Sequence, residues 1–206
     1  MSDDEAVPPA ARLVRDFINT REPQIDDESL GTLDDLRDWL AERRLLAGDA
    51  RLDSSDLAAA TAVREGLRAV LLGHAGHASE SGAVDALNDT LADLPVELRF
   101  TDQGYRLVSA VDRPFGHAVA HLADAIRQCS EDGTWPRLKV CARDSCRWAF
   151  YDASKNKVRR WCSMAGCGNH IKMQRAHATR KSRQRQPPDG APKPIRNQEA
   201  HTPGRP

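Results

Sequence analysis

Four cysteines near the C-terminal end constrain the fold of this chain more than any other feature. They form two pairs with the same internal spacing, Cys141-x4-Cys146 and Cys162-x4-Cys167, with fifteen residues between the pairs. Zinc prefers four ligands in a tetrahedron, and thiolates suit it. The pattern therefore predicts one structural Zn²⁺ ion, and four sulfurs leave no open position for a catalytic water.

Other interpretations of the cysteines stay open at this point. A cytosolic disulfide or unliganded thiols would use the same residues. An iron–sulfur cluster is possible in principle, although the hairpin-sized gap between the pairs favours zinc. Cys129 stands outside the pattern, on an expected helix, and we interpret it as a small core residue.

The segments around the cysteines predict a small zinc finger. "RLKVC" can be a strand that delivers Cys141, and "RWAFYD" and "KVRRWC" can form a hairpin around the polar turn "ASKNK". "NHIKMQRAHATRKSRQR" is typical of a helix capped by Asn169. This order resembles a treble-clef zinc finger. Four aromatic side chains should form its small core in preference to stacking on bases: Trp148, Phe150, Tyr151 and Trp161.

The preceding part of the chain predicts a mostly helical domain with one small β-hairpin. Thr32 should cap one helix, with Asp35 completing a capping box, and Ser54 or Ser55 should cap a longer one. "VELRF" and "YRLVSA" alternate in hydropathy around the turn "TDQG", which predicts the hairpin. Apolar residues recur at helical spacing in residues 11–20, 33–46, 56–75, 82–95 and 115–129.

These elements predict an α+β chain, mainly α, in four parts. Residues 10–133 would form the helical domain, and residues 134–185 the treble-clef-like finger with its four cysteines. Residues 1–9 are acidic and Pro-rich, and residues 186–206 are Pro-rich with almost no apolar content. Segments of this composition cannot form a core, so both ends should be disordered.

Charge is divided sharply along the chain, although the formal net charge is zero. Residues 1–135 contain 26 Asp and Glu against 13 Arg and no Lys, whereas residues 136–206 contain 17 Arg and Lys against 4 Asp and Glu. A basic segment can bind a polyanion such as nucleic acid. It can also dock on the acidic part of its own chain or of a second chain.

The residues around the second cysteine pair resemble a known family. The C-x4-C pair followed by "RRWCSMAGCGNH" closely resembles the CGNR zinc finger, with His170 where that family has Arg. "LVRDFINT" resembles the opening of the ABATE domain that precedes this finger, with Asp16, Asn19 and Thr20 at the matching polar positions. The resemblance covers about residues 11–182. It implies a bacterial, stress-induced transcription regulator that binds DNA through the finger.

We therefore expect double-stranded DNA as the partner, with RNA as an alternative. Contacts should come from the hairpin tip and from one stripe of the C-terminal helix. The candidate residues are Lys155, Lys157, Arg159, His170, Lys172, Arg175, Arg180 and Arg183. Arg143, Arg147 and Arg160 could instead offset the negative charge of a zinc–tetrathiolate centre. A zinc-stabilised protein-interaction module without sequence-specific DNA contact is the alternative function.

The helical domain should sense a signal or pair two chains, so a homodimer and a small-molecule effector are further expected partners. Asp16 and Asn19 are candidates for a ligand pocket, although they could equally be a cap and a turn. The sequence has no nucleophile-elbow, P-loop or dinucleotide motif, and we do not expect an enzyme.

Four histidines are close in sequence, as the pairs His74 and His77 and His117 and His121. Without a third ligand in view, we interpret them as core or surface residues. The N-terminus is polar, and no apolar run approaches the roughly 20 residues needed to cross a bilayer. We therefore expect a cytoplasmic protein without membrane association.

Overall fold

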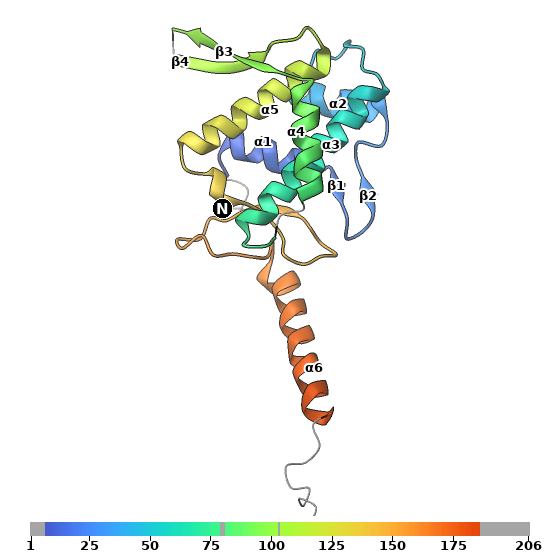
Figure 1. The fold of residues 1–206 in the computed structure, drawn as a ribbon, viewed down its shortest axis with the longest axis vertical. Helices are drawn as coiled ribbons and strands as arrows, with labels where there is room; N and C mark the ends of the chain where they lie inside the picture. Colours follow the sequence, from blue (N-terminus) through green and yellow to red (C-terminus); the bar gives the residue numbers. More distant parts are fainter. Residues whose placement is uncertain (1–6, 79–80, 103, 186–206) are drawn as a thin grey trace, which may run out of the picture. The chain divides into compact units, whose positions relative to one another are not determined.

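The structure of the chain is a computed structural model that describes residues 7–78, 81–102 and 104–185 (Figure 1). Its contacts divide the chain into two compact units, residues 1–169 and residues 170–206. All four paired cysteines belong to the first unit. Residues 1–6 and 186–206, predicted to be disordered, lie outside the described residues. Val7, within the N-terminal segment predicted to be disordered, is buried against the core.

The predicted fold class, mainly helical with small antiparallel sheets, is confirmed. The described residues of the first unit form the helices α1 (Pro9–Ile18), α2 (Leu33–Glu42), α3 (Ser54–His74), α4 (Ser81–Ala92) and α5 (Pro114–Glu131). The helix α6 (Asn169–Arg185) follows. Among the described residues, no helix is long and apolar enough to cross a membrane.

Three two-stranded antiparallel sheets accompany the helices in the described residues. The predicted hairpin near residues 96–109 is confirmed, whereas the short pairing after α1 was not expected. The pairs are β1 (Arg21–Glu22) with β2 (Asp27–Glu28), β3 (Val96–Thr101) with β4 (Gly104–Ser109), and β5 (Leu138–Val140) with β6 (Ala149–Tyr151).

Two helices begin with complete capping boxes. Thr32 Oγ1 accepts a hydrogen bond from the backbone of Asp35, whose carboxylate accepts one from the backbone of Thr32, as predicted. For α3, the prediction of Ser54 or Ser55 was wrong. The cap is Asp53, one residue earlier, because its carboxylate accepts the backbone N–H groups of both Ser55 and Asp56.

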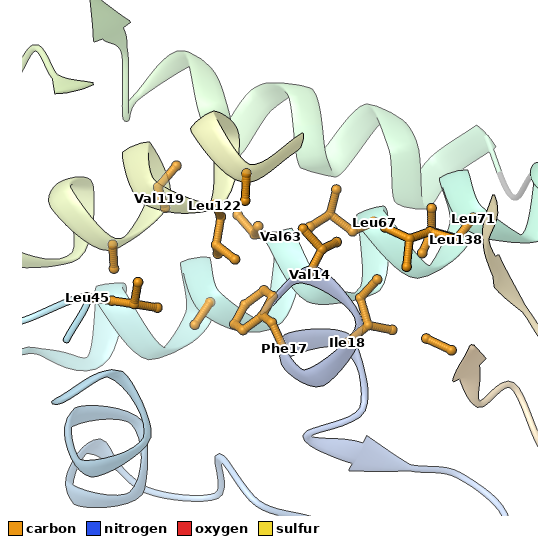
Figure 2. Close-up of a cluster of buried hydrophobic side chains, with 14 of the residues drawn as sticks. Val14, Phe17, Ile18, Leu45, Val63, Leu67, Leu71, Val119, Leu122 and Leu138 are labelled. Atoms are coloured by element: carbon orange, nitrogen blue, oxygen red, sulfur yellow. The ribbon is translucent and has the colours of Figure 1, made fainter. Parts of the chain in front are cut away.

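The core lies where α1 packs between α3 and α5 (Figure 1). Val14, Phe17 and Ile18 of α1 have no exposed surface, as expected for residues at helical spacing. Leu138 of β5 lies in the same cluster (Figure 2). Cys129 is also fully buried, which confirms it as a core residue.

The close approach of α3 and α4 depends on Gly66. A Cβ atom added there would lie 2.3 Å from the Cβ of Leu87 and 2.9 Å from the carbonyl oxygen of Ala83. Both distances are well inside van der Waals contact, so only glycine fits at this crossing.

Two buried arginines of α3 connect segments far apart in the sequence. Arg64 makes a bidentate ion pair with Glu28 of β2, at 2.6 and 2.7 Å. Arg68 donates to the carbonyl oxygens of Ile18 and Arg147, both at 2.7 Å. These side chains fix the end of α1 and the first cysteine loop to the same face of α3.

The hairpin predicted for "RWAFYD" and "KVRRWC" is wrong. β6 pairs with β5, and residues 157–162 form no strand. The side chain of Asn19 also holds β6 at the end of α1: its Nδ2 donates to the oxygen of Ala149 at 2.9 Å, and its Oδ1 accepts from the same residue's N–H at 2.8 Å. The β5–β6 sheet is therefore part of the main core.

Candidate functional site

The four paired cysteines converge on one point. The Sγ atoms of Cys141, Cys146, Cys162 and Cys167 all lie within 4.8 Å of one another. Zinc–sulfur bonds of about 2.3 Å in a tetrahedron require sulfur–sulfur distances of about 3.8 Å. The distance from Cys162 Sγ to Cys146 Sγ is 3.7 Å and to Cys167 Sγ 3.8 Å. These residues fit one structural zinc ion, as predicted.

Thiols packed this closely need a cation to ionise together. Hydrogen bonds donated by Cys146 and Cys162 lower the pKa of Cys141, because they stabilise its thiolate. The same contacts raise the pKa of Cys162, since a second thiolate would face the first. A divalent cation removes that repulsion, which is the chemistry that zinc supplies here.

Two tight loops place the cysteines. Cys141 directly follows β5, and its N–H donates to the carbonyl of Trp148 at 2.9 Å. The loop between them turns at Arg147, whose φ of 51° is left-handed. The second pair lies around a π-helical turn over Met164–Gly168, closed by a hydrogen bond from Gly168 N–H to the carbonyl of Ser163.

The surroundings of the cluster indicate a structural role. Cys141, Cys146 and Cys167 are at most 5 % exposed. Trp148 and Trp161 pack against the cluster as expected, whereas Tyr151, predicted for the same small core, packs against the main core. Arg143 Nη1 lies 3.9 Å from Cys167 Sγ, where its charge offsets that of a thiolate.

A buried ion pair supports the segment after β6. Lys139 Nζ of β5 donates to Asp152 Oδ2 at 2.8 Å, and both side chains are almost fully buried. Burial alone would raise the pKa of Asp152, but hydrogen bonds from Lys139, Ser154 and Arg159 lower it to about 2. Lys139 also donates to the carbonyl oxygens of Lys157 and Arg159. The pair thus fixes the turn that carries the predicted phosphate-contacting lysines.

The candidate cations of this turn differ in their exposure to solvent. Lys155 and Lys157 are exposed. The Arg159 side chain lies inward instead: its Nη2 donates to the carbonyl of Cys162 at 2.6 Å, and its guanidinium lies 5.2 Å from the centre of the Phe150 ring. Arg159 therefore lines a cavity, described below, beside the zinc cluster.

Helix α6 carries the remaining candidates. His170, Lys172 and Arg180 are exposed, and the neighbouring Lys181 is exposed as well. The side chains of Arg175 and Arg183 lie outside the part that the structure describes. The four described side chains give the helix a solvent-facing set of cationic and titratable groups, which is what a phosphate-contacting segment requires.

Asp16 and Asn19 line a cavity of about 700 Å³ between α1, α2 and the β6 region. The cavity lies within the first unit. Three arginines and one acidic residue supply its charges: Arg15, Arg43, Arg159 and Asp16. Its apolar walls include Trp39, Trp148 and Phe150, and Cys162 also lines it. A cavity with excess positive charge and flat aromatic walls can hold a small anion with a planar apolar part.

The three arginines differ in how far their charge is already offset: Arg15 and Arg43 pair with carboxylates, whereas Arg159 donates to a backbone carbonyl. Arg15 pairs with Asp16 Oδ1 at 2.7 Å. Arg43 lies over the Trp39 ring at 4.0 Å. The Nε of Arg159 is buried and has no hydrogen-bond partner among the described residues.

The histidines lie elsewhere. Nδ1 of His74 donates to the carbonyl of Leu138 at 2.9 Å, so this histidine helps to hold β5. His77 accepts a hydrogen bond from Arg160 at 2.9 Å. His117 and His121 line a separate cavity of about 290 Å³, and no potential metal-binding group of three among the described residues includes them. No histidine belongs to the lining of the larger cavity.

Comparison with known families agrees with this geometry. A family model, ABATE, described as "Putative stress-induced transcription regulator", matches residues 11–144. A second model, the CGNR zinc finger, matches residues 137–181 and includes all four cysteines. Both descriptions are of regulator and zinc-finger types and not of enzymes. A comparison with curated proteins found no match.

Proposed function

This chain belongs to the ABATE family, with a CGNR zinc finger at its C-terminal end, and we propose that it is a transcription regulator that binds double-stranded DNA. The zinc centre would order the finger, and the cations of the turn and of α6 would contact phosphates. We place this activity in the cytoplasm, where reduced thiols remain available to metal.

The observation that carries this proposal is the exposure of cations in two places, on the turn after β6 and on α6. Lys155 and Lys157 lie on a turn that the buried Lys139–Asp152 pair holds in place. Lys172 and Arg180 are exposed on α6. Each phosphate that a cation neutralises releases counterions, so these groups favour binding to duplex DNA at low salt.

A titration of fluorescent duplex DNA with zinc-loaded and chelated protein tests the proposal. Zinc-loaded protein should bind, and chelation should weaken binding at least tenfold because the loops of the two cysteine pairs would lose the ion that joins them. Affinity should fall steeply with salt, with a log–log slope of about −4 if four cations contact phosphates. Selection from random duplexes would then identify a preferred sequence.

Matched variants separate phosphate contact from general charge. The triple variant Lys172→Ala, Arg180→Ala and Lys181→Ala should lose DNA affinity and keep its zinc. A control that removes three exposed arginines of the helical domain should bind normally: Arg44→Ala, Arg51→Ala and Arg106→Ala. Equal binding by chelated protein, or equal loss in both triple variants, would contradict the proposal and favour a protein-interaction module.

We propose in addition that the 700 Å³ cavity binds a small effector, an anion with a flat apolar part. Arg15, Arg43 and Arg159 would contact its charge, and the aromatic walls its apolar part. The cavity touches Cys162, so an occupant would contact the loop that holds the second cysteine pair.

Isothermal titration with benzoate and indole-3-acetate, against their neutral amides, tests this site. The carboxylates should bind and the amides should bind more weakly. Arg43→Met should weaken carboxylate binding, whereas Arg44→Met, at the exposed position next to it, should not. No binding of either carboxylate at millimolar concentration, or equal binding of acid and amide, would refute an anion site and leave the DNA proposal unaffected.

A further inference from the structure

The β3–β4 hairpin leaves an apolar face uncovered. Val96, Leu98 and Phe100 alternate along β3, so their side chains share one face, and they are 37, 50 and 77 % exposed. Tyr105 of β4 opposes Phe100, with ring centres 6.3 Å apart, and is also exposed. A contiguous apolar face of this kind marks an interaction surface.

The two edges of the hairpin differ. The backbone N–H of Leu107 in β4 donates to Asp124 Oδ1 of α5 at 3.0 Å, and the Tyr105 hydroxyl donates to Glu131 of the same helix. Helix α5 therefore covers the β4 edge, and β3 is the outer strand (Figure 1). Within residues 7–78, 81–102 and 104–185, no hydrogen bond reaches the outward backbone groups of β3.

The register determines which backbone groups point outward. Since the N–H of Leu107 faces Asp124, the opposed pair Leu98–Leu107 is not hydrogen-bonded across the hairpin. Bonded and non-bonded pairs alternate in antiparallel strands, so the N–H and C=O groups of Val96, Leu98 and Phe100 all point away from β4. The residues with the exposed apolar side chains thus also present the unpaired backbone groups.

We propose that two copies of this chain pair through the outer edges of their β3 strands, antiparallel, about a two-fold axis at Leu98. In this register Leu98 opposes Leu98 of the second copy, and Val96 opposes Phe100. All three are residues whose backbone groups point outward, so each opposed pair forms two main-chain hydrogen bonds. The two hairpins then form one four-stranded antiparallel sheet with a continuous apolar face.

The charges of β3 are complementary in the same register. Glu97 opposes Arg99 of the second copy, and Arg99 opposes its Glu97. Within one chain, Glu97 and Arg99 pair along the strand at 2.9 Å, but Arg99 also directly opposes Arg106 of β4. Like charges in that position repel, and Glu97 of the second copy would offset the repulsion. The segment "VELRF" is therefore self-complementary in charge, apolar content and backbone polarity.

This pairing closes with two copies. Helix α5 covers the β4 edge at Leu107, so the four-stranded sheet would have no open edge for a third chain. The inference goes beyond the proposed function and holds whether or not the protein binds DNA.

Charge reversals on β3 test the pairing. Wild-type protein, zinc-loaded and at full length, should have twice the chain mass of 22.7 kDa in analytical ultracentrifugation. In the variant Glu97→Arg, the new arginine faces Arg99 of the second copy. In the variant Arg99→Glu, the new glutamate faces Glu97 of the second copy. Each variant alone therefore brings like charges together and should be monomeric. An equimolar mixture of the two variants restores opposite charges at both positions and should dimerise, as should the double variant.

The control Asp85→Arg changes net charge as much as Glu97→Arg does, at an exposed position of α4, and should remain dimeric. Circular dichroism confirms that each variant is folded. A wild type that stays monomeric at hundreds of micromolar overturns the proposal. The proposal is also refuted if the mixture of the two folded variants stays monomeric. It is refuted as well if the protein dimerises but none of the β3 substitutions weakens the dimer.

Discussion

Replacing Lys139 by methionine should destabilise the protein strongly, because it removes one partner of a buried ion pair. Lys139 Nζ lies 2.8 Å from Asp152 Oδ2, and the two side chains are 4 % and 0 % exposed. Methionine keeps most of the apolar stem, so the change tests the charge and its hydrogen bonds more than packing volume.

The expected cost follows from the groups left without a partner. Removing one member of a buried pair typically costs about 3–5 kcal/mol. Asp152 would keep its bonds from Ser154 and from the backbone of Arg159, which favours the lower end, about 3 kcal/mol. In a unit of this size, that corresponds to a decrease in Tm of roughly 6–12 °C.

Urea denaturation and thermal unfolding of zinc-loaded protein measure this cost. Asp152→Asn alone should cost less, since Lys139 keeps two carbonyl acceptors. The double variant Lys139→Met, Asp152→Asn should lose less than the sum of the two single losses, because no unpaired charge remains. A Lys139→Met cost below about 1 kcal/mol, or strictly additive losses, would show that the pair is not coupled as we argue.

Three further predictions concern the helical domain. Gly66→Ala should cost about 1–3 kcal/mol in urea denaturation, because its Cβ would lie 2.3 Å from that of Leu87; a neutral effect would refute the tight crossing. Asn19→Ala removes both hydrogen bonds between α1 and β6 and should cost about 2 kcal/mol, whereas an unchanged denaturation midpoint would contradict that role. Burial would raise the pKa of Asp124, but the hydrogen bonds donated by Arg127 and its neighbours hold it below 3.8. The ionised carboxylate therefore stabilises the fold above that pH, and this stabilisation is lost as pH falls. The difference in unfolding free energy between wild type and Asp124→Asn should shrink in acid. A difference that does not change with pH would refute this prediction.

Features whose partners are close in sequence could be predicted. The capping box of Thr32 and Asp35 depends on three residues of separation, and the zinc ligands on two equal gaps. The apolar spacing of α1 also predicted which of its residues are buried, because an amphipathic helix buries its apolar face whatever element it packs against. These patterns were enough for the fold class and the metal.

The pairing of β6 was mispredicted because alternation identifies a strand without identifying its partner. The polar segment after Asp152 suggested a local hairpin. Instead, the ion pair with Lys139 holds that segment as an irregular turn, and β5 provides the partner strand. The same limit applies to β3, where alternation indicated one apolar face but not that the face is uncovered.

Long-range polar contacts left no trace in the sequence. Asn19 and Ala149 are 130 positions apart, and Arg68 contacts Arg147 across 79 positions. The sequence indicates Asn19 as a matching polar position of a known domain and as a pocket candidate, but its role in holding β6 depends on the fold. Buried arginines such as Arg64 are indistinguishable from surface ones by composition alone.

The strand β5 belongs to both halves of this protein, and the two family matches overlap on it, over residues 137–144. A domain boundary placed before β5 would remove Leu138 and Val140 from the hydrophobic core of the helices. A boundary placed after β5 would separate Cys141 from the strand that positions it. The finger is thus not an interchangeable cassette. An exchange of the helical part or of the zinc finger between relatives would have to include the matching surface of α1 and α3.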